Sequence, residues 1–239
     1  MITGFIETFR WPFRDIRWAE KTWPMPLLAF VPVLDIVAFE GWRIRVIKQM
    51  ARGAAPLPEF DFVEQLIEGI RLILCRLLYV FVPIIVMNLL GSGGFIGRIL
   101  DIGLFLSGDG QALGEDFISD LLTNIGVIIA WYVLSAPAFH CGMIRYALND
   151  DWRCLLNIPM NILWVLRYAG MFLLFYVYAV LAAIAIFLIS GFLTITAVGV
   201  ILVPIAVFCL YYTMSAHELG GLAHTIAERR ERRAAAREA

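Results

Sequence analysis

The sequence is short of charged residues, and neither sign of charge is in clear excess. Only 16% of the 239 residues are Asp, Glu, Lys or Arg, whereas 61% are hydrophobic and the mean hydropathy is +0.81. This polar fraction is too small to coat a water-soluble globule, so we expect lipid to cover much of the surface. The net charge of −1 lacks the surplus of Lys and Arg that phosphates demand, which excludes nucleic acid as a partner.

Residue patterns that carry chemistry are also sparse. The four cysteines include no short-spaced pair, which argues against a disulfide framework and against a zinc site. No serine lies in a glycine elbow, and Gly91–Gly94 lacks the lysine and the strand of a phosphate loop. We therefore expect a protein that is not an enzyme and has no metal or cofactor. A cofactor at His140 or His217 stays open as a weaker alternative, which an absorption spectrum decides.

Long apolar runs dominate what is present. A run of about 20 apolar residues spans a hydrocarbon core. Such runs occupy about residues 24–42, 72–90, 121–143, 162–189 and 193–214. The predicted fold is therefore an all-α polytopic transmembrane helical bundle of about five segments. The first run contains Pro24, Pro26, Pro32 and Asp35, so it either crosses the bilayer or re-enters on the same side.

Amphipathic segments flank these runs. Residues 1–23 gather apolar side chains on one arc and basic ones on another, which predicts an interfacial helix. Trp11, Trp18 and Trp23 suit the headgroup level of a membrane. Residues 60–70 predict a second short amphipathic helix before the second run. The predicted organisation is thus an interfacial helix, a transmembrane domain over residues 24–215, and a helical tail over residues 216–239.

Basic residues in the short connections predict the topology, because Lys and Arg are retained on the cytoplasmic side. They mark two connections, one with Arg43, Arg45, Lys48 and Arg52 and one with Arg145 and Arg153. They also mark the tail, which contains Arg229, Arg230, Arg232, Arg233 and Arg237. The tail is therefore expected in the cytoplasm, where its arginines also suit the anionic membrane interface. The side of the N-terminus depends on whether the first run crosses.

A weak internal repeat bears on that choice. The segment Ala38–Arg45 matches Ala138–Arg145 at four of eight positions, and each copy ends an apolar run. A parallel duplication of about residues 24–90 and 121–189 would produce this pattern. On that interpretation the first run crosses the bilayer, as the third run does.

Several short motifs resemble a known family. They are the stretch from Trp11 to Trp18, Gly41 to Arg45, Gly53, Leu57 to Phe60, Gly69 with the run through Tyr79, Ser135 to Ala138, and Ala216 to Gly220. Over most of residues 9–222 the chain resembles the prokaryotic membrane-protein family called domain of unknown function 4013. The resemblance implies a multi-pass protein of the prokaryotic inner membrane and supplies no catalytic or ligand residues. The polar link at residues 149–153 and the Arg-rich tail depart from the family's pattern.

Ionisable residues inside apolar runs are functional candidates by default, because burying them in lipid is costly. The candidate intramembrane polar cluster comprises Asp35, Glu40, Arg76, His140 and Arg167. A structural interpretation pairs Glu40 with Arg43 or Arg76 and leaves Arg167 at the interface.

Two functions remain. The first is a non-enzymatic accessory or structural subunit of a membrane complex, or a bilayer-organising protein, with lipid and other membrane subunits as partners. The alternative is a small carrier or channel with a polar site around Asp35, Glu40 and Arg76.

Overall fold

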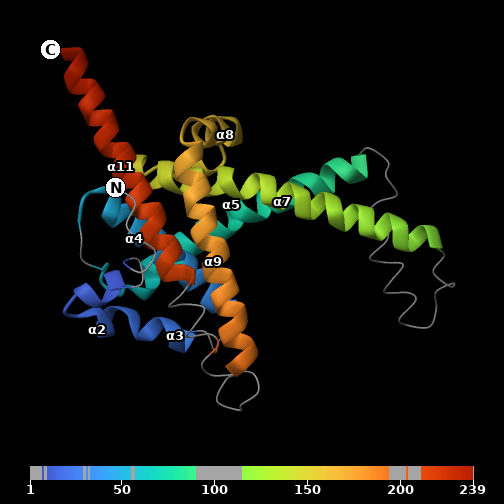
Figure 1. Ribbon diagram of the computed structural model, residues 1–239, viewed down its shortest axis with the longest axis horizontal. Helices are drawn as coiled ribbons and strands as arrows, with labels where there is room; N and C mark the ends of the chain where they lie inside the picture. Colours follow the sequence, from blue (N-terminus) through green and yellow to red (C-terminus); the bar gives the residue numbers. More distant parts are fainter. Residues whose placement is uncertain are drawn as a thin grey trace. The chain divides into compact units, whose positions relative to one another are not determined.

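The computed structural model consists of helices joined by turns and short connections wherever it describes the chain (Figure 1). The described residues are 7, 10–28, 31, 33–54, 57–89, 115–193, 203 and 211–238. None of them lies in a strand, which confirms the all-α prediction. The chain divides into two compact units, Met1–Ile73 with Ala138–Ala239, and Leu74–Pro137. We call them the large unit and the small unit and describe each separately.

The N-terminal residues of the large unit form short helices instead of the one interfacial helix expected over residues 1–23. These helices are η1 (Trp11–Arg14), α2 (Trp18–Thr22) and α3 (Pro24–Leu28). Pro12 favours the start of η1, and the extended Asp15 ends it. The Oδ1 atom of Asp15 accepts a hydrogen bond from the amide of Arg17 at 2.9 Å, a local bond that competes with helix continuation. Residues 1–6, 8 and 9 lie outside the described part.

The first apolar run is divided between two helices, α3 and α4 (Leu34–Ala51). Val33, with a φ of 74°, precedes α4, and Gly53, with a φ of 77°, follows it. A left-handed backbone ends a helix readily at glycine, which pays no Cβ penalty there. The interruption agrees with the proline content of the run. That the run crosses the bilayer or re-enters on the same side stays a prediction.

The core of the large unit forms around α4. Its buried apolar side chains recur at helical spacing, and α11 (Thr213–Glu238) packs along it (Figure 1). One hydrophobic cluster contains Trp11, Met25, Ala38, Phe39, Trp42, Val46, Leu57 and Ala216. The tail predicted to begin at residue 216 is helical, and its first turns are buried against α4. Only the turns from about residue 229 onward are exposed.

Two glycines let α5 (Phe62–Leu89) approach α4 backbone to backbone. A Cβ atom on Gly41 would lie 1.8 Å from the carbonyl oxygen of Gln65, and one on Gly69 would lie 1.9 Å from that of Val37. Asp61 caps α5, since its Oδ1 accepts from the amide of Glu64 at 3.0 Å. The separate amphipathic helix predicted at residues 60–70 is wrong, because α5 continues from it into the second apolar run without a break.

The later runs show two further differences. The third lies inside α7 (Glu115–Asn149), and the polar link forms η2 (Trp152–Leu155). The fourth run is two helices, α8 (Ile158–Arg167) and α9 (Ala169–Leu193), so the uninterrupted span predicted at residues 162–189 is wrong. The break predicted at Ser190 and Gly191 is also absent, because α9 runs through both. Most of the fifth run lies outside the described residues.

Within the described residues, two helices are long and apolar enough to cross a membrane, judged by length and composition alone. They are Ile125–Asn149 and Ala169–Phe192. In the small unit, the parts of α5 and α7 are joined by the Trp131 indole, which donates to the carbonyl oxygen of Tyr79 at 2.7 Å. The described residues therefore support an all-helical protein with two helices that could cross a membrane. The five membrane-spanning segments stay a prediction.

Candidate functional site

A fully buried ion pair lies within the large unit. Glu40 and Arg43, one turn apart on α4, are 2.6 Å apart, and their side chains are 2% and 0% exposed. The Arg43 guanidinium also donates to the sulfur of Met143 at 3.3 Å and lies 5.9 Å from the ring of Tyr212. Positions 43 and 143 correspond in the internal repeat, so the two copies meet at this point.

The other members of the predicted polar cluster have different neighbours. Asp35, in the first turn of α4, bonds the amide of Ile36 at 2.7 Å. Arg76 belongs to the small unit, where its guanidinium donates to the hydroxyl of Tyr132. Asp35 and Glu40 are five positions apart in α4, which puts them on different faces of the helix.

His140 and Arg167 are placed by aromatic residues. The Nδ1 atom of His140 lies 2.8 Å from the hydroxyl of Tyr176, and its ring packs against Phe175 with centroids 5.3 Å apart. The Arg167 guanidinium lies 5.9 Å from the ring centroid of Tyr168. For His140 this is the environment of a hydrogen-bonded packing residue.

Glu68 is the centre of a second polar network in the large unit. Its Oε1 accepts from Lys48 at 3.1 Å and lies 3.5 Å from Arg71, and its Oε2 accepts from the Tyr146 hydroxyl. Lys48 also pairs with Asp150 at 2.7 Å. The hydrogen bond from Lys48 lowers the pKa of Asp150. Burial alone would lower the pKa of Lys48, but its bonds to Asp150, Tyr146 and Glu68 outweigh burial and raise it.

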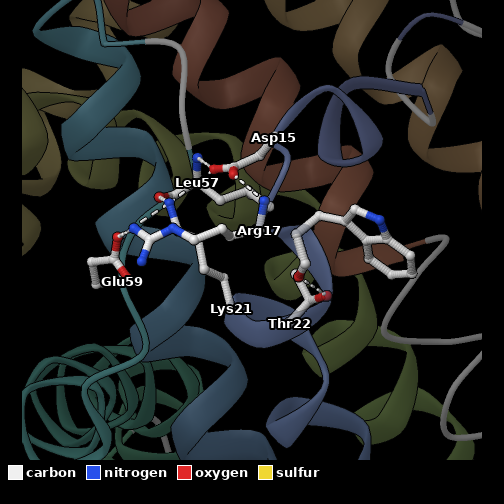
Figure 2. A network of polar contacts seen from close by, with 7 residues as sticks. Asp15, Arg17, Lys21, Thr22, Leu57 and Glu59 are labelled. Carbon is white, nitrogen blue, oxygen red and sulfur yellow. Dashed lines mark hydrogen bonds and ion pairs between the residues drawn. The ribbon is translucent and has the colours of Figure 1, made fainter.

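Asp15 and Lys21 form a third network, which ties α2 to the segment after α4. Figure 2 shows the Asp15 carboxylate held between Lys21 and the backbone. Its Oδ2 accepts from Lys21 and from the Leu57 amide, both at 2.9 Å, and Lys21 donates to the Leu57 carbonyl at 2.9 Å. Glu59 accepts from Arg17 and lies 3.3 Å from Lys21. The hydrogen bond from Lys21 is the main cause that lowers the pKa of Asp15.

A pocket of about 460 Å³ opens beside the residues of these last two networks. It is lined by Lys21, Arg45, Lys48, Gln49, Arg52, Ala54, Leu57, Pro58, Glu59 and Glu64. Its volume falls in the range of sites for small ligands. Four basic and two acidic side chains line it, and the two lysines are also bonded to Asp15, Glu68 and Asp150, so binding of an anion would depend on Arg45 and Arg52. We call this site the basic pocket.

One face of the end of α4, together with the residue that follows it, forms one wall of the basic pocket. Arg45, Lys48, Gln49 and Arg52 stand at helical spacings of three, four and seven residues. Arg45 pairs with Glu64 at 2.9 Å. These groups are suited to binding an anion by hydrogen bonds and charge. The described lining contains no serine, cysteine or histidine to act as a nucleophile or a base.

The predicted membrane-interface residues differ in exposure. Trp11 is buried, with its ring 5.1 Å from that of His217, whereas Trp18 and Trp23 are 39% and 62% exposed. In the tail, Arg229, Arg230 and Arg232 are exposed. The guanidinium of Arg230 lies 4.4 Å from the ring of Trp164. The side chain of Arg233 lies outside the described residues.

Sequence reasoning missed the basic pocket, although part of the signal was present. Arg45, Lys48 and Arg52 were interpreted only as markers of a cytoplasmic connection. Their helical spacing with Gln49 already indicated one polar face of a helix. Lys21 comes from a distant segment, and no local pattern indicates that it joins them.

The chain matches the model of a known protein family over most of its length. The model of a family described as protein of unknown function (DUF4013) matches residues 25–195. This range includes every residue of the basic pocket except Lys21. No curated protein and no solved structure matches the chain.

Proposed function

Because the chain belongs to the DUF4013 family, whose description assigns no activity, we propose a function from the chain's own geometry. The protein is a non-enzymatic integral membrane protein that acts through its contacts, as an accessory or structural subunit of a membrane complex. Its C-terminal tail lies in the cytoplasm.

The observation that carries this proposal is the surface of α9. Within Ala169–Phe192, the most apolar 18-residue window has a mean hydropathy of 2.8, and only 17% of that window is buried. Leu173, Phe187 and Phe192 are 68%, 77% and 76% exposed. An apolar helix of this length that stays uncovered by its own chain requires lipid or another apolar helix around it.

The small unit supports the same proposal. Its exposed large hydrophobic side chains include Leu74, Leu77, Leu78, Phe81, Ile85, Ile125, Ile129 and Val133. A soluble protein usually exposes large apolar side chains singly, whereas α5 and α7 expose many of them close together. Apolar surface on several helices favours a role that depends on binding lipid and neighbouring membrane helices.

The carrier alternative has less support. A transport site needs charged groups that exchange partners with a substrate, whereas Glu40 and Arg43 are paired with each other and nearly inaccessible. Asp35 bonds a backbone amide within its own helix turn. These contacts favour a structural role for the ionisable residues of α4.

Alkaline carbonate extraction of membranes from cells that express the full chain tests the membrane assignment. We expect the chain to stay in the lipid fraction and to float with it. The variant V180D/L181D puts two carboxylates at the exposed middle of the apolar segment of α9. Each costs about 3 kcal/mol at a bilayer centre, so the inserted fraction falls. The matched control is A234D/A235D in the exposed tail, which leaves insertion unchanged. Release of the wild-type chain as a soluble monomer contradicts the proposal.

Purification from native membranes in mild detergent tests the subunit role. We expect a defined protein partner that co-purifies in constant ratio. A lone particle that orders the lipid around it supports a bilayer-organising role instead. A lone particle without any effect on lipid order contradicts both.

A further inference from the structure

The basic pocket combines a ligand-sized volume with two arginine side chains that pair with exposed carboxylates. One of them, Arg45, is 15% exposed and also donates to the carbonyl oxygen of Asp61 at 3.4 Å. The volume of the pocket is about 460 Å³, and two of its four basic side chains are arginines. All of its lining residues belong to the large unit. The proposed membrane role does not use this pocket.

The two lysines of the pocket are already engaged. The ammonium of Lys48 bonds Glu68 and Asp150 at 3.1 and 2.7 Å. Lys21 bonds Asp15 and the Leu57 carbonyl and is 6% exposed. An ammonium has only three N–H donors. Because most of these donors are already used, the two lysines hold the pocket residues in place and offer a ligand few new hydrogen bonds.

The two arginines have donors to spare. The guanidinium of Arg52 is 66% exposed, and its contact with Asp150 is 3.8 Å long, beyond hydrogen-bond distance. Arg45 pairs with Glu64, which is 55% exposed and therefore able to move aside into solvent. Each guanidinium presents five N–H donors in a planar fork. Gln49 lies between them on the same face and adds an amide donor.

The geometry points to a phosphate group as the ligand of the basic pocket. Arg45 lies near the end of α4 and Arg52 directly follows that helix. The planar fork of a guanidinium can donate to two phosphate oxygens at once. We infer that Arg45 and Arg52 bind the phosphate in exchange for Glu64 and Asp150, while Gln49 donates to it. A lipid headgroup and a free phosphate share this chemistry, and only the lipid source rests on the proposed membrane role.

Titration of the purified full chain in a maltoside detergent tests the inference, because binding in detergent does not depend on insertion into a bilayer. The probes are inorganic phosphate, dioctanoyl phosphatidic acid and dioctanoylglycerol, measured by calorimetry. We expect a phosphate-bearing probe to bind with a stoichiometry of one molecule per chain. We expect dioctanoylglycerol, which has no phosphate, not to bind. Phosphatidic acid that binds about tenfold more tightly than inorganic phosphate identifies a lipid headgroup. Equal affinities identify free phosphate.

Variants separate a built site from general charge attraction. R45Q/R52Q weakens binding by about tenfold or more, because two charge-assisted contacts are lost. The control R229Q/R232Q makes the same change in net charge on the exposed tail and stays within about twofold of the wild type. Should R45Q/R52Q fail to fold, Gln49→Leu removes one neutral donor and weakens binding by about threefold. The inference is overturned if no phosphate probe binds, or if both arginine pairs weaken binding equally.

Discussion

Replacement of Gly41 by alanine tests the close crossing of α4 and α5. The new Cβ atom would lie 1.8 Å from the Gln65 carbonyl oxygen, whereas ordinary contact begins at 3.4 Å. The helices must therefore separate by about 1.6 Å at this point. The obstacle is backbone of another helix and cannot rotate away as a side chain would. We expect a cost near the upper end of overpacking, about 3 kcal/mol.

Gly221→Ala is the matched control. Gly221 lies in α11 of the same large unit, and a Cβ atom there meets nothing within 4 Å. The substitution should stabilise the helix by up to about 1 kcal/mol, because alanine has the higher helix propensity. The same chemical change is thus expected to have opposite signs at the two positions.

Thermal unfolding in detergent, followed by circular dichroism, measures both effects. A change of 1 kcal/mol shifts the Tm of a chain of this size by about 2–4 °C. Gly41→Ala should therefore lower the Tm by about 6–12 °C, and Gly221→Ala should raise it by a few degrees. Gly69→Ala, whose Cβ would lie 1.9 Å from the Val37 carbonyl, should behave like Gly41→Ala. Equal Tm values for the alanine variants at positions 41 and 221 would refute the backbone contact.

Three further predictions follow from the polar contacts. Because the pKa of Asp15 is lowered in the folded chain, its ionised form stabilises the fold above its ordinary pKa of about 4, and this contribution is lost as the pH falls through the lowered pKa. Asp15→Asn should thus destabilise at pH 7 and become equal to the wild type in strong acid, as measured by urea unfolding. Glu40→Gln leaves the Arg43 charge buried without its partner and should cost about 3–5 kcal/mol. The double variant E40L/R43L should recover most of that loss. A double variant as unstable as Glu40→Gln would contradict the explanation that the cost comes from an unpaired buried charge. Trp164→Leu removes the ring beneath Arg230, costs about 1 kcal/mol of cation–π attraction, and should speed tryptic cleavage of the tail.

Local patterns predicted much of the secondary structure but not its interruptions. Apolar periodicity predicted helix in the amphipathic segments and the apolar runs, and the prolines of the first run predicted its division. The break at Tyr168 and the continuity of α5 through Gly69 were not predicted. By helix propensity alone, Gly69 would be expected to interrupt α5. In the structure its lack of a side chain lets α4 pack directly against the α5 backbone. Whether a glycine interrupts a helix or allows close packing depends on the neighbouring helix, which local sequence does not specify.

The sequence by itself determined that this protein is helical, strongly apolar and short of catalytic residue patterns, because composition and periodicity act along the chain. Only the tertiary structure decided the partners of its charges. It paired Glu40 with Arg43 and brought Lys21 to the face of α4 that carries Arg45 and Arg52. The physical reason is that each buried charge requires a partner within a few ångströms. In the folded chain that partner can come from a segment that is distant in the sequence. The basic pocket therefore forms only when such distant segments pack together.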